Sequence, residues 1–274
     1  MRHFLRRLPA GNQVGAGNTT TFQVPLGPTY RDFNLRPKIA GVDATEAQMR
    51  AQMTQVRCKI NGIQRWGGNG GRLIDLYEYY GFTLASGVFP MLFSRPNART
   101  IVAEENSCLG TGNVDSLTIE VDLDAAATID SIDLDAVYTP EKRDLGPLIE
   151  VHENTFTAGA AGTFEISTLP RSRGDLVGMH LFSSLITAFE LEVDAVTYFD
   201  GDLTTLNNVL TRTGRAPVTN VVHYEPAYLD RYDDGIPLRG VQDFRQKLTM
   251  SGAGSVPIMM ETLNVPIQSS AQRA

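Results

Sequence analysis

Five aspartates crowded into residues 122–135 are the side chains best placed to bind a metal ion. They are Asp122, Asp124, Asp130, Asp133 and Asp135. Because side chains alternate along a strand, Asp122 and Asp124 should share one face, and Asp133 and Asp135 should share another. Convergent carboxylates are ligands that Ca²⁺ prefers, although the spacing does not follow the EF-hand loop. These four aspartates are therefore candidate calcium ligands, and the alternative is that they lie on the solvated faces of two strands.

A glycine-rich stretch invites comparison with a phosphate-binding loop. Gly67-Gly68-Asn69-Gly70-Gly71 precedes an expected helix. It has neither the GK[ST] ending of a P-loop nor the repeating GxGxxG spacing. We therefore expect a structural loop.

No arrangement typical of a catalytic site stands out. The four histidines form neither an HxH nor an HExxH pair; they are His3, His152, His180 and His223. No serine stands in a GxSxG motif, and Cys58 and Cys108 fit no CxxC motif. His180 lies within a strand-like apolar run, where we expect it to be packed or hydrogen-bonded. The sequence thus predicts no catalytic or cofactor-binding residue, and a protein that is not an enzyme.

The composition is that of a globular protein without a basic excess. Apolar residues make up 42% and charged residues 20% of the chain, enough to bury two cores. The net charge of −7 argues against direct nucleic-acid binding, whose footprint would be basic. Two cysteines suggest assembly in a reducing compartment. The basic start lacks the apolar stretch of a signal peptide, and no apolar run is long enough to span a bilayer.

The elements that position these residues occur twice. Residues 56–66, VRCKINGIQRW, match residues 189–199, FELEVDAVTYF, at an offset of 133. The paired apolar positions are Val56 with Phe189, Cys58 with Leu191, Ile60 with Val193, Ile63 with Val196 and Trp66 with Phe199. Apolar and polar residues alternate in both copies, which indicates half-buried strands. Asn61-Gly62 and Asp194-Ala195 interrupt the strands at the same place, as hairpin turns do.

The same register continues into a helix in each copy. The helically spaced apolar residues are Leu73, Leu76, Tyr77 and Tyr80 in the first copy and Leu203, Leu206 and Leu210 in the second. Gly81 and Gly214 follow these helices, and Asp202 precedes the second, as helix caps do. Strand, turn, strand and helix thus recur with one spacing, which indicates a duplicated unit.

Further strand-like segments follow each helix. They cover residues 87–93, 117–123 and 129–137 in the first copy and 218–224, 244–250 and 256–263 in the second. Residues 21–24 resemble residues 163–166 at an offset of 142, so the first copy has an extra segment near residues 41–50, expected to be a loop or a short helix. Many short strands with turns between them indicate two β-sandwiches.

Short collinear fragments, from the N-terminus to about residue 181, carry a family likeness. They are Met1-Arg2, Phe4-Leu5, Ala16-Gly17-Asn18, Pro25-Leu26-Gly27, Thr29-Tyr30, Leu35-Arg36, Ser94-Arg95-Pro96, Asp124-Ala125-Ala126-Ala127, Leu169-Pro170-Arg171 and Gly178-Met179-His180-Leu181. On these residues the chain resembles the major coat proteins of corticoviruses, in the double jelly-roll lineage that includes tectiviruses and adenoviruses. The extra segment near residues 41–50 departs from the family, so no loop function is carried over there.

The resemblance implies an all-β fold of two tandem eight-stranded antiparallel jelly rolls, each with one short helix. We expect a basic arm over residues 1–18, a first jelly roll over 19–139, a linker over 140–150 and a second jelly roll over 151–274. The implied function is that of a major capsid protein of the virion. Its homotrimers would fill pseudo-hexagonal positions of an icosahedral shell around an internal membrane. Implied partners are further copies, a vertex (penton) protein, and small membrane proteins or lipid, with assembly in the host cytoplasm.

The N-terminal arm is the best candidate for contact with the membrane. Its residues of interest are Arg2, Phe4, Leu5, Arg6, Arg7 and Leu8, and residues 1–30 contain no acidic residue. Clustered arginines near an anionic membrane contribute about 1 kcal/mol each, and the apolar side chains could be buried there. The alternative is a frayed, solvated terminus.

Two other classes of protein compete with the coat protein. A bicupin-like metal-dependent enzyme also has two tandem β-barrels, but it needs clustered His and Glu ligands that are not apparent here. A carbohydrate-binding β-sandwich would expose aromatic platforms. The only tryptophan, Trp66, instead occupies the core-facing position that Phe199 has in the second copy.

Overall fold

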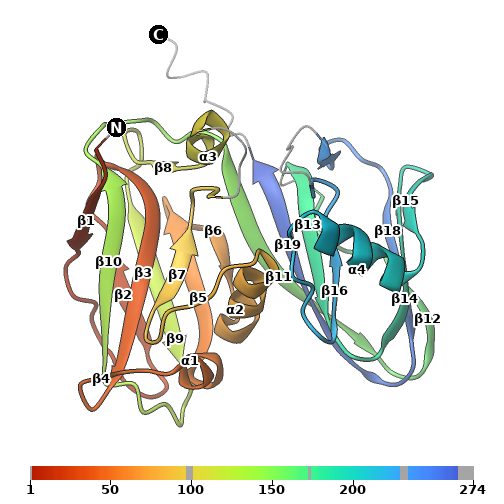
Figure 1. The fold of residues 1–274 in the computed structure, drawn as a ribbon, viewed down its shortest axis with the longest axis horizontal. Helices are drawn as coiled ribbons and strands as arrows, with labels where there is room; N and C mark the ends of the chain where they lie inside the picture. The colour runs from red at the N-terminus through yellow and green to blue at the C-terminus, as the bar shows by residue number, and fades with distance from the viewer. Residues whose placement is uncertain (1, 97–100, 172–173, 229–233, 265–274) are drawn as a thin grey trace. The chain divides into compact units, whose positions relative to one another are not determined.

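A computed structural model describes residues 2–96, 101–171, 174–228 and 234–264. The chain forms two compact units, shown in Figure 1. The first contains the residues up to Gly71 together with Leu84–Ile149, and the second contains Arg72–Thr83 together with Glu150–Leu263. The short segment 72–83 therefore belongs with the second unit, although it lies within the first half of the sequence.

The first unit consists of two antiparallel sheets (Figure 1). In one sheet, β10 lies between β1 and β3, and the other edge of β3 pairs in turn with the short strands β8, β7 and β4. These strands are β1 (Phe4–Arg7), β3 (Thr29–Ile39), β4 (Val42–Asp43), β7 (Phe89–Leu92), β8 (Leu109–Gly110) and β10 (Ser131–Thr139). The second has the order β2-β9-β5-β6, with β2 (Thr19–Gln23), β5 (Met53–Ile60), β6 (Ile63–Gly68) and β9 (Leu117–Leu123).

The core of the first unit lies between its two sheets. Along β9 the residues alternate between buried and half-buried, as the sequence predicts for this segment. The ring of Phe93, just after β7, lies 5.8 Å from Phe33 on one sheet and 6.3 Å from Trp66 on the other. Trp66 is buried, so its predicted core-facing position is confirmed.

The second unit also consists of two antiparallel sheets. One has the order β12-β18-β14-β15, with β12 (Gly162–Ile166), β14 (Ile186–Val193), β15 (Val196–Asp200) and β18 (Phe244–Met250). The other has the order β11-β19-β13-β16, and the short strand β17 (Ile236–Pro237) also pairs with β13. The bounds of the four strands are β11 (Leu148–Ala158), β13 (Asp175–Phe182), β16 (Val221–Tyr224) and β19 (Gly254–Asn264). Phe189 of the first sheet contacts Tyr224 of the second, so the core again lies between the sheets.

The strand order confirms the predicted duplication. Strands β1, β10, β3 and β7 correspond in order to β11, β19, β13 and β16, and strands β2, β9, β5 and β6 correspond to β12, β18, β14 and β15. The two hairpins agree in detail: Cys58 faces Trp66 across the ladder as Leu191 faces Phe199. A β-bulge follows Cys58 in one hairpin and Leu191 in the other. Bulges pin the register, so this shared irregularity marks a common origin.

The helices agree with the prediction in part. The two predicted helices are present as α2 (Gly70–Tyr79) and α4 (Leu203–Arg212), and both end in the same way: Phe82 N donates to Tyr77 O, and Arg215 N to Leu210 O. These bonds, with Gly81 and Gly214 at positive φ, are Schellman caps.

Within the described residues the first half contains two helices besides α2, one of them in the segment expected to be a loop or a short helix. The extra segment near residues 41–50 contains α1 (Glu46–Gln52), which Thr45 and Gln48 begin with a capping box. A fourth helix, α3 (Ile101–Asn106), was not predicted, because six residues are too few for a helical period to show. No helix in the described residues is long and apolar enough to cross a membrane.

The two hairpin turns provide a matched test of the duplicated geometry. Gly62 and Ala195 are the second residues of two-residue turns and have φ of 75° and 64°. An L side chain in this left-handed region costs about 1 kcal/mol. We therefore expect Ala195→Gly to raise the free energy of unfolding by up to about 1 kcal/mol, and Gly62→Ala to lower it similarly. Denaturant unfolding measures both, and a loss of stability in A195G would contradict the assigned turn geometry.

Candidate functional site

The predicted N-terminal arm is ordered as an edge strand over Phe4–Arg7. β1 pairs with β10 in antiparallel register, with Phe4 opposite Tyr138 and Arg7 opposite Asp135. The ring of Phe4 stacks on Tyr138, and Leu8 is buried. Leu5 is 73% exposed, and Arg2 and Arg6 are exposed as well. The exposed side chains of this segment are thus basic or apolar, and its role at a membrane stays a prediction.

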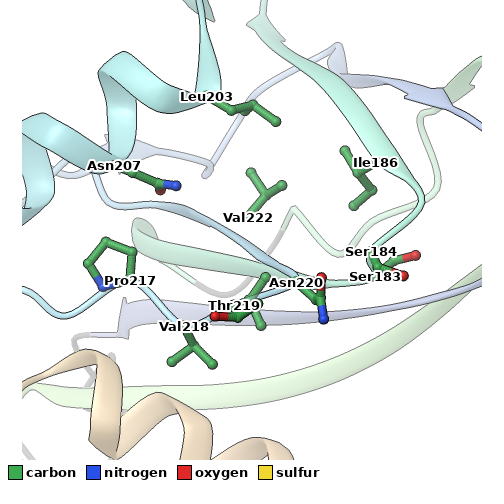
Figure 2. A pocket seen from close by; sticks show the side chains of 11 residues that line it. Ser183, Ser184, Ile186, Leu203, Asn207, Pro217, Val218, Thr219, Asn220 and Val222 are labelled. Atoms are coloured by element: carbon green, nitrogen blue, oxygen red, sulfur yellow. The ribbon is translucent and has the colours of Figure 1, made fainter.

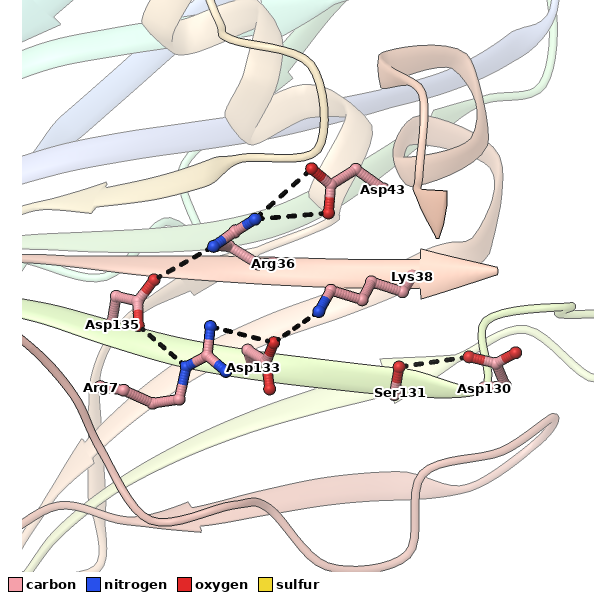
Figure 3. Close-up of polar contacts among 8 residues, drawn as sticks. All are labelled: Arg7, Arg36, Lys38, Asp43, Asp130, Ser131, Asp133 and Asp135. Carbon is pink, nitrogen blue, oxygen red and sulfur yellow. Dashed lines mark hydrogen bonds and ion pairs between the residues drawn. The ribbon is translucent and has the colours of Figure 1, made fainter. Parts of the chain in front are cut away.

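Two of the candidate calcium ligands lie in an ion-pair network on the outer face of the first sheet (Figure 3). Asp133 Oδ2 lies 2.9 Å from Lys38 Nζ and 3.3 Å from Arg7 Nη2, and Asp135 Oδ1 lies 3.4 Å from Arg7 Nε. Arg36 completes the network between Asp135 and Asp43. The hydrogen bond from Lys38 holds the pKa of Asp133 below its usual value. These carboxylates therefore join β1, β10 and β3 through side chains.

The other aspartates of the cluster have different partners. Asp122 lies on the other sheet, where it accepts hydrogen bonds from Arg57 Nη2 at 2.6 Å and from Thr19 Oγ1 at 2.6 Å. Asp124 accepts from the backbone of Ala126, and Asp130 from the backbone of Ala40. Among the described residues no group of three or more His, Cys, Asp or Glu side chains could hold a metal ion. The four predicted calcium ligands are divided between two sheets, and calcium binding stays a prediction.

The glycine-rich stretch, expected to be a structural loop, instead consists of the end of β6 at Gly67-Gly68 and the start of α2 at Gly70-Gly71, with Asn69 between them. A Cβ at Gly67 would lie 2.4 Å from the carbonyl oxygen of Val56, and one at Gly70 would lie 2.5 Å from that of Met53. Both distances are too short for any side chain, so the glycines permit the close approach of β6 and the start of α2 to β5.

The two cysteines are free and buried. Burial raises the pKa of the Cys58 thiol to about 12 and that of Cys108 to about 11. Since only a thiolate is a good nucleophile, neither side chain is suited to covalent catalysis at neutral pH.

A cavity of about 330 Å³ lies in the second unit beside α4 (Figure 2). Its lining is formed by Ser183, Ser184, Ile186, Leu203, Asn207, Pro217, Val218, Thr219, Asn220, Val221 and Val222. Hydroxyl and amide groups are the polar groups of this lining, and it contains no acid, base or thiol. The lining therefore provides no base to activate its serine and threonine hydroxyls and no group for acid–base chemistry.

A buried polar cluster in the second unit is the feature that the sequence analysis missed most completely. Tyr79 of α2, His180 of β13 and His223 of β16 are fully buried, and the rings of Tyr79 and His223 stack at 4.1 Å. Glu225, also buried, accepts hydrogen bonds from Tyr79 Oη at 2.6 Å and from Arg215 Nε at 2.8 Å. The sequence contains one indication of this cluster, which is that His180 stands inside an apolar strand run. From it we predicted that His180 is packed or hydrogen-bonded, and this is confirmed.

The hydrogen bonds of the cluster fix the tautomers of both histidines. The backbone N–H of Val218 donates to His223 Nε2 at 3.1 Å, so the proton of His223 is on Nδ1. That proton is donated to His180 Nδ1 at 2.8 Å, which leaves the proton of His180 on Nε2, 3.4 Å from Glu261 Oε2. A continuous series of hydrogen bonds thus leads from the Val218 N–H through His223 and His180 to the carboxylate of Glu261. Tyr80 Oη donates to the same Glu261, and Tyr79 stacks on His223, so these two tyrosines attach residues 72–83 to the strands of the second unit.

Comparison with known proteins identifies the family. The viral coat protein P2 N-terminal domain matches residues 5–139, and the viral coat protein P2 C-terminal domain matches residues 148–266. The chain belongs to the P2 family of viral coat proteins. The major capsid protein P2 of Pseudoalteromonas phage PM2 is 25% identical to this coat protein over 285 residues, covering 97% of this chain and 98% of that one.

Solved structures confirm the fold. The crystal structure of the major capsid protein P2 from bacteriophage PM2 has a TM-score of 0.87 at 21% identity, covering 98% of this coat protein and 99% of that chain. The STIV major capsid protein has a TM-score of 0.71 at 11% identity, covering 97% and 98%. The double jelly-roll prediction is therefore confirmed.

The relatives also decide between the classes of function. They are structural capsid proteins and not enzymes. The coat protein is accordingly a major capsid protein of the virion, and the bicupin-like and carbohydrate-binding alternatives are set aside.

The histidine cluster makes the stability of the second unit depend on pH. Burial and the neighbouring His180 hold the pKa of His223 well below its usual 6.5. His223 is thus neutral in the folded state, whereas the unfolded chain binds a proton below pH 6.5. Its contribution to stability is complete above that pH and is lost as the pH falls, with a slope of up to about 1.4 kcal/mol per pH unit.

Thermal unfolding between pH 7 and pH 5 tests this dependence. The melting temperature should fall with pH in the wild type and fall less steeply in His223→Gln, which keeps a hydrogen-bonding side chain without the titration. His3→Gln, at an exposed position, is the matched control and should leave the slope unchanged. An equal slope in H223Q and the wild type would contradict the assigned role. Tyr79 and His180 contact His223, and Glu225, Arg215 and Glu261 are the charged partners of those two residues and of each other; both variants retain all five.

Proposed function

We propose that this coat protein assembles into homotrimers that form pseudo-hexagonal capsomers of an icosahedral shell. The observation that carries the proposal is the presence of two jelly-roll units with one strand order in a single chain. Three such chains contain six similar units, so a threefold oligomer can occupy a position with six neighbours. Full-length similarity of the fold to a chain of the Sulfolobus Turreted Icosahedral Virus, with a TM-score of 0.71, supports the icosahedral shell.

The same proposal extends to the surroundings of the shell. We infer neighbouring capsomers, a vertex (penton) protein, and an internal membrane with its lipid or small membrane proteins as the partners, and the host cytoplasm as the place of assembly. The net charge of −7 supports an inner face that does not contact nucleic acid directly. Exposed Arg2 and Arg6 are cationic groups that could lie near anionic lipid.

The mass of the purified chain in solution tests the trimer. Three chains of 30.0 kDa give about 90 kDa, which light scattering after size exclusion resolves from a monomer. We expect the larger mass across a concentration series, because obligate interfaces of capsid proteins are extensive. A stable monomer under all of these conditions would contradict the proposed function.

Calcium is tested in the same measurement. If ions at Asp122, Asp124, Asp133 or Asp135 stabilise the assembly, EDTA lowers the mass and added Ca²⁺ restores it. The ion pairs with Lys38, Arg7 and Arg57 already neutralise three of these carboxylates, so we expect the mass to be unchanged by EDTA.

A further inference from the structure

Two strands in the coat protein have an unpaired edge together with exposed apolar side chains. Within the described residues β1 pairs only with β10, and β15 pairs only with β14. All four residues of β1 are exposed, and Phe4 and Leu5 are 44% and 73% accessible. On β15, Val196 and Tyr198 are 55% and 44% accessible. An exposed edge of this kind offers free N–H and C=O groups to another strand, and proteins normally cover or charge it.

The duplicated counterparts show that these strand positions are compatible with burial. β11 has the place in its sheet that β1 has, and its residues from Leu148 to His152 are buried. β6 has the place of β15, and its residues from Trp66 to Gly68 are buried. Ile63 of β6, the counterpart of Val196, is 55% exposed as well, so the two copies differ at the ends of these strands where Trp66 to Gly68 and Leu148 to His152 are buried, whereas Tyr198 and all of β1 are exposed.

The two exposed edges have opposite charge. Residues 1–8 contain Arg2, Arg6 and Arg7 and no acidic residue. Residues 194–202, which include β15, contain Asp194, Asp200 and Asp202 and no basic residue. Glu190 and Glu192 of the neighbouring strand β14 are paired with Lys247, so they are not counted in this comparison. Complementary charge around an apolar centre is the pattern expected of a specific protein interface.

We propose that β1 of one copy of the coat protein pairs along β15 of a second copy. The contact is an addition of one strand to a sheet edge, in which main-chain hydrogen bonds provide affinity and side chains provide specificity. Phe4 and Leu5 would then pack against Val196 and Tyr198, and the arginines would lie beside the aspartates.

This interface rests on the proposed trimer and specifies how it closes. Each chain has one β1 and one β15, so the contact is head-to-tail and every copy contributes both edges. Head-to-tail contacts form a closed ring when the rotation between copies completes a circle. Three copies joined in this way leave neither edge exposed.

Cysteine cross-linking tests the contact directly. We expect Leu5→Cys chains mixed with Tyr198→Cys chains to give a disulfide-linked dimer under oxidising conditions on a non-reducing gel. Phe4→Cys and Val196→Cys extend the test to adjacent registers, since a disulfide needs Cα atoms within about 7 Å. Each variant alone should give no dimer, because a head-to-tail contact never brings identical positions together. The native Cys58 and Cys108 are buried and do not interfere.

Charge reversal tests the electrostatic part. Arg6→Glu and Asp200→Arg should each raise the concentration at which the trimer dissociates by about tenfold or more, and the double variant should recover much of the loss. Lys142→Glu, at an exposed position outside both edges, is the matched control and should not change dissociation. Far-ultraviolet circular dichroism confirms that each variant is folded.

The outcomes separate this interface from the proposed function. A wild-type trimer in which no cysteine pair cross-links, and in which R6E and D200R leave dissociation unchanged, overturns the interface and leaves the trimer intact. A wild-type chain that remains monomeric overturns both. If R6E leaves the trimer unchanged but abolishes binding to vesicles containing phosphatidylglycerol, β1 faces a membrane and the interface is wrong.

Discussion

Each sheet of this coat protein buries one face, and this burial determines which residues of a strand must point inward and therefore how the strands pair. Because side chains alternate along a strand, a slip of one residue would expose Leu117, Ile119 and Val121 and bury the polar residues Thr118 and Glu120 between them. The apolar pattern of the strands therefore specifies the register, and features outside the core reinforce it. Two-residue turns hold it at the hairpin ends, and the bulges after Cys58 and Leu191 hold it within the hairpins.

Ion pairs between neighbouring strands, on the outer faces of the sheets, also favour the native register. The acidic and basic positions of these pairs are exchanged between the two copies. In the first unit Arg57 of β5 faces Glu120 of β9, with 3.1 Å between Nε and Oε2. In the second unit Glu190, at the position of Arg57, faces Lys247 of β18, with 2.7 Å between the charged atoms. Exposed pairs contribute only about 0.2–1 kcal/mol each. Their effect is on specificity, since a wrong pairing of strands from the two units would bring like charges together.

The sequence was sufficient wherever a residue's partner lies close along the chain or in the repeated register. The hairpins, α2, α4 and the strand over residues 117–123 follow from alternation, turn residues and caps. Long-range features were not accessible in this way. Glu225 lies 146 residues from its partner Tyr79, and the edge strand β1 becomes recognisable only when β10 is placed beside it. The aspartates of residues 122–135 show why. They are close together in the sequence, but three of them pair with lysine and arginine side chains of other strands, which the sequence does not reveal.

The assignment of residues 72–83 to the second unit has a consequence for how the chain folds during its synthesis. When a ribosome has completed the first half, Tyr79 has been made but His180, His223 and Glu225 have not. The segment must therefore wait, with its tyrosine unpaired, until more than half of the remaining chain has emerged. A chain that begins at Glu150 would likewise lack Tyr79 and Tyr80, leaving Glu225 and Glu261 without those hydrogen-bond donors. The second half of the sequence therefore lacks part of the buried polar cluster of its own unit, and the two halves are not equivalent to two independent copies.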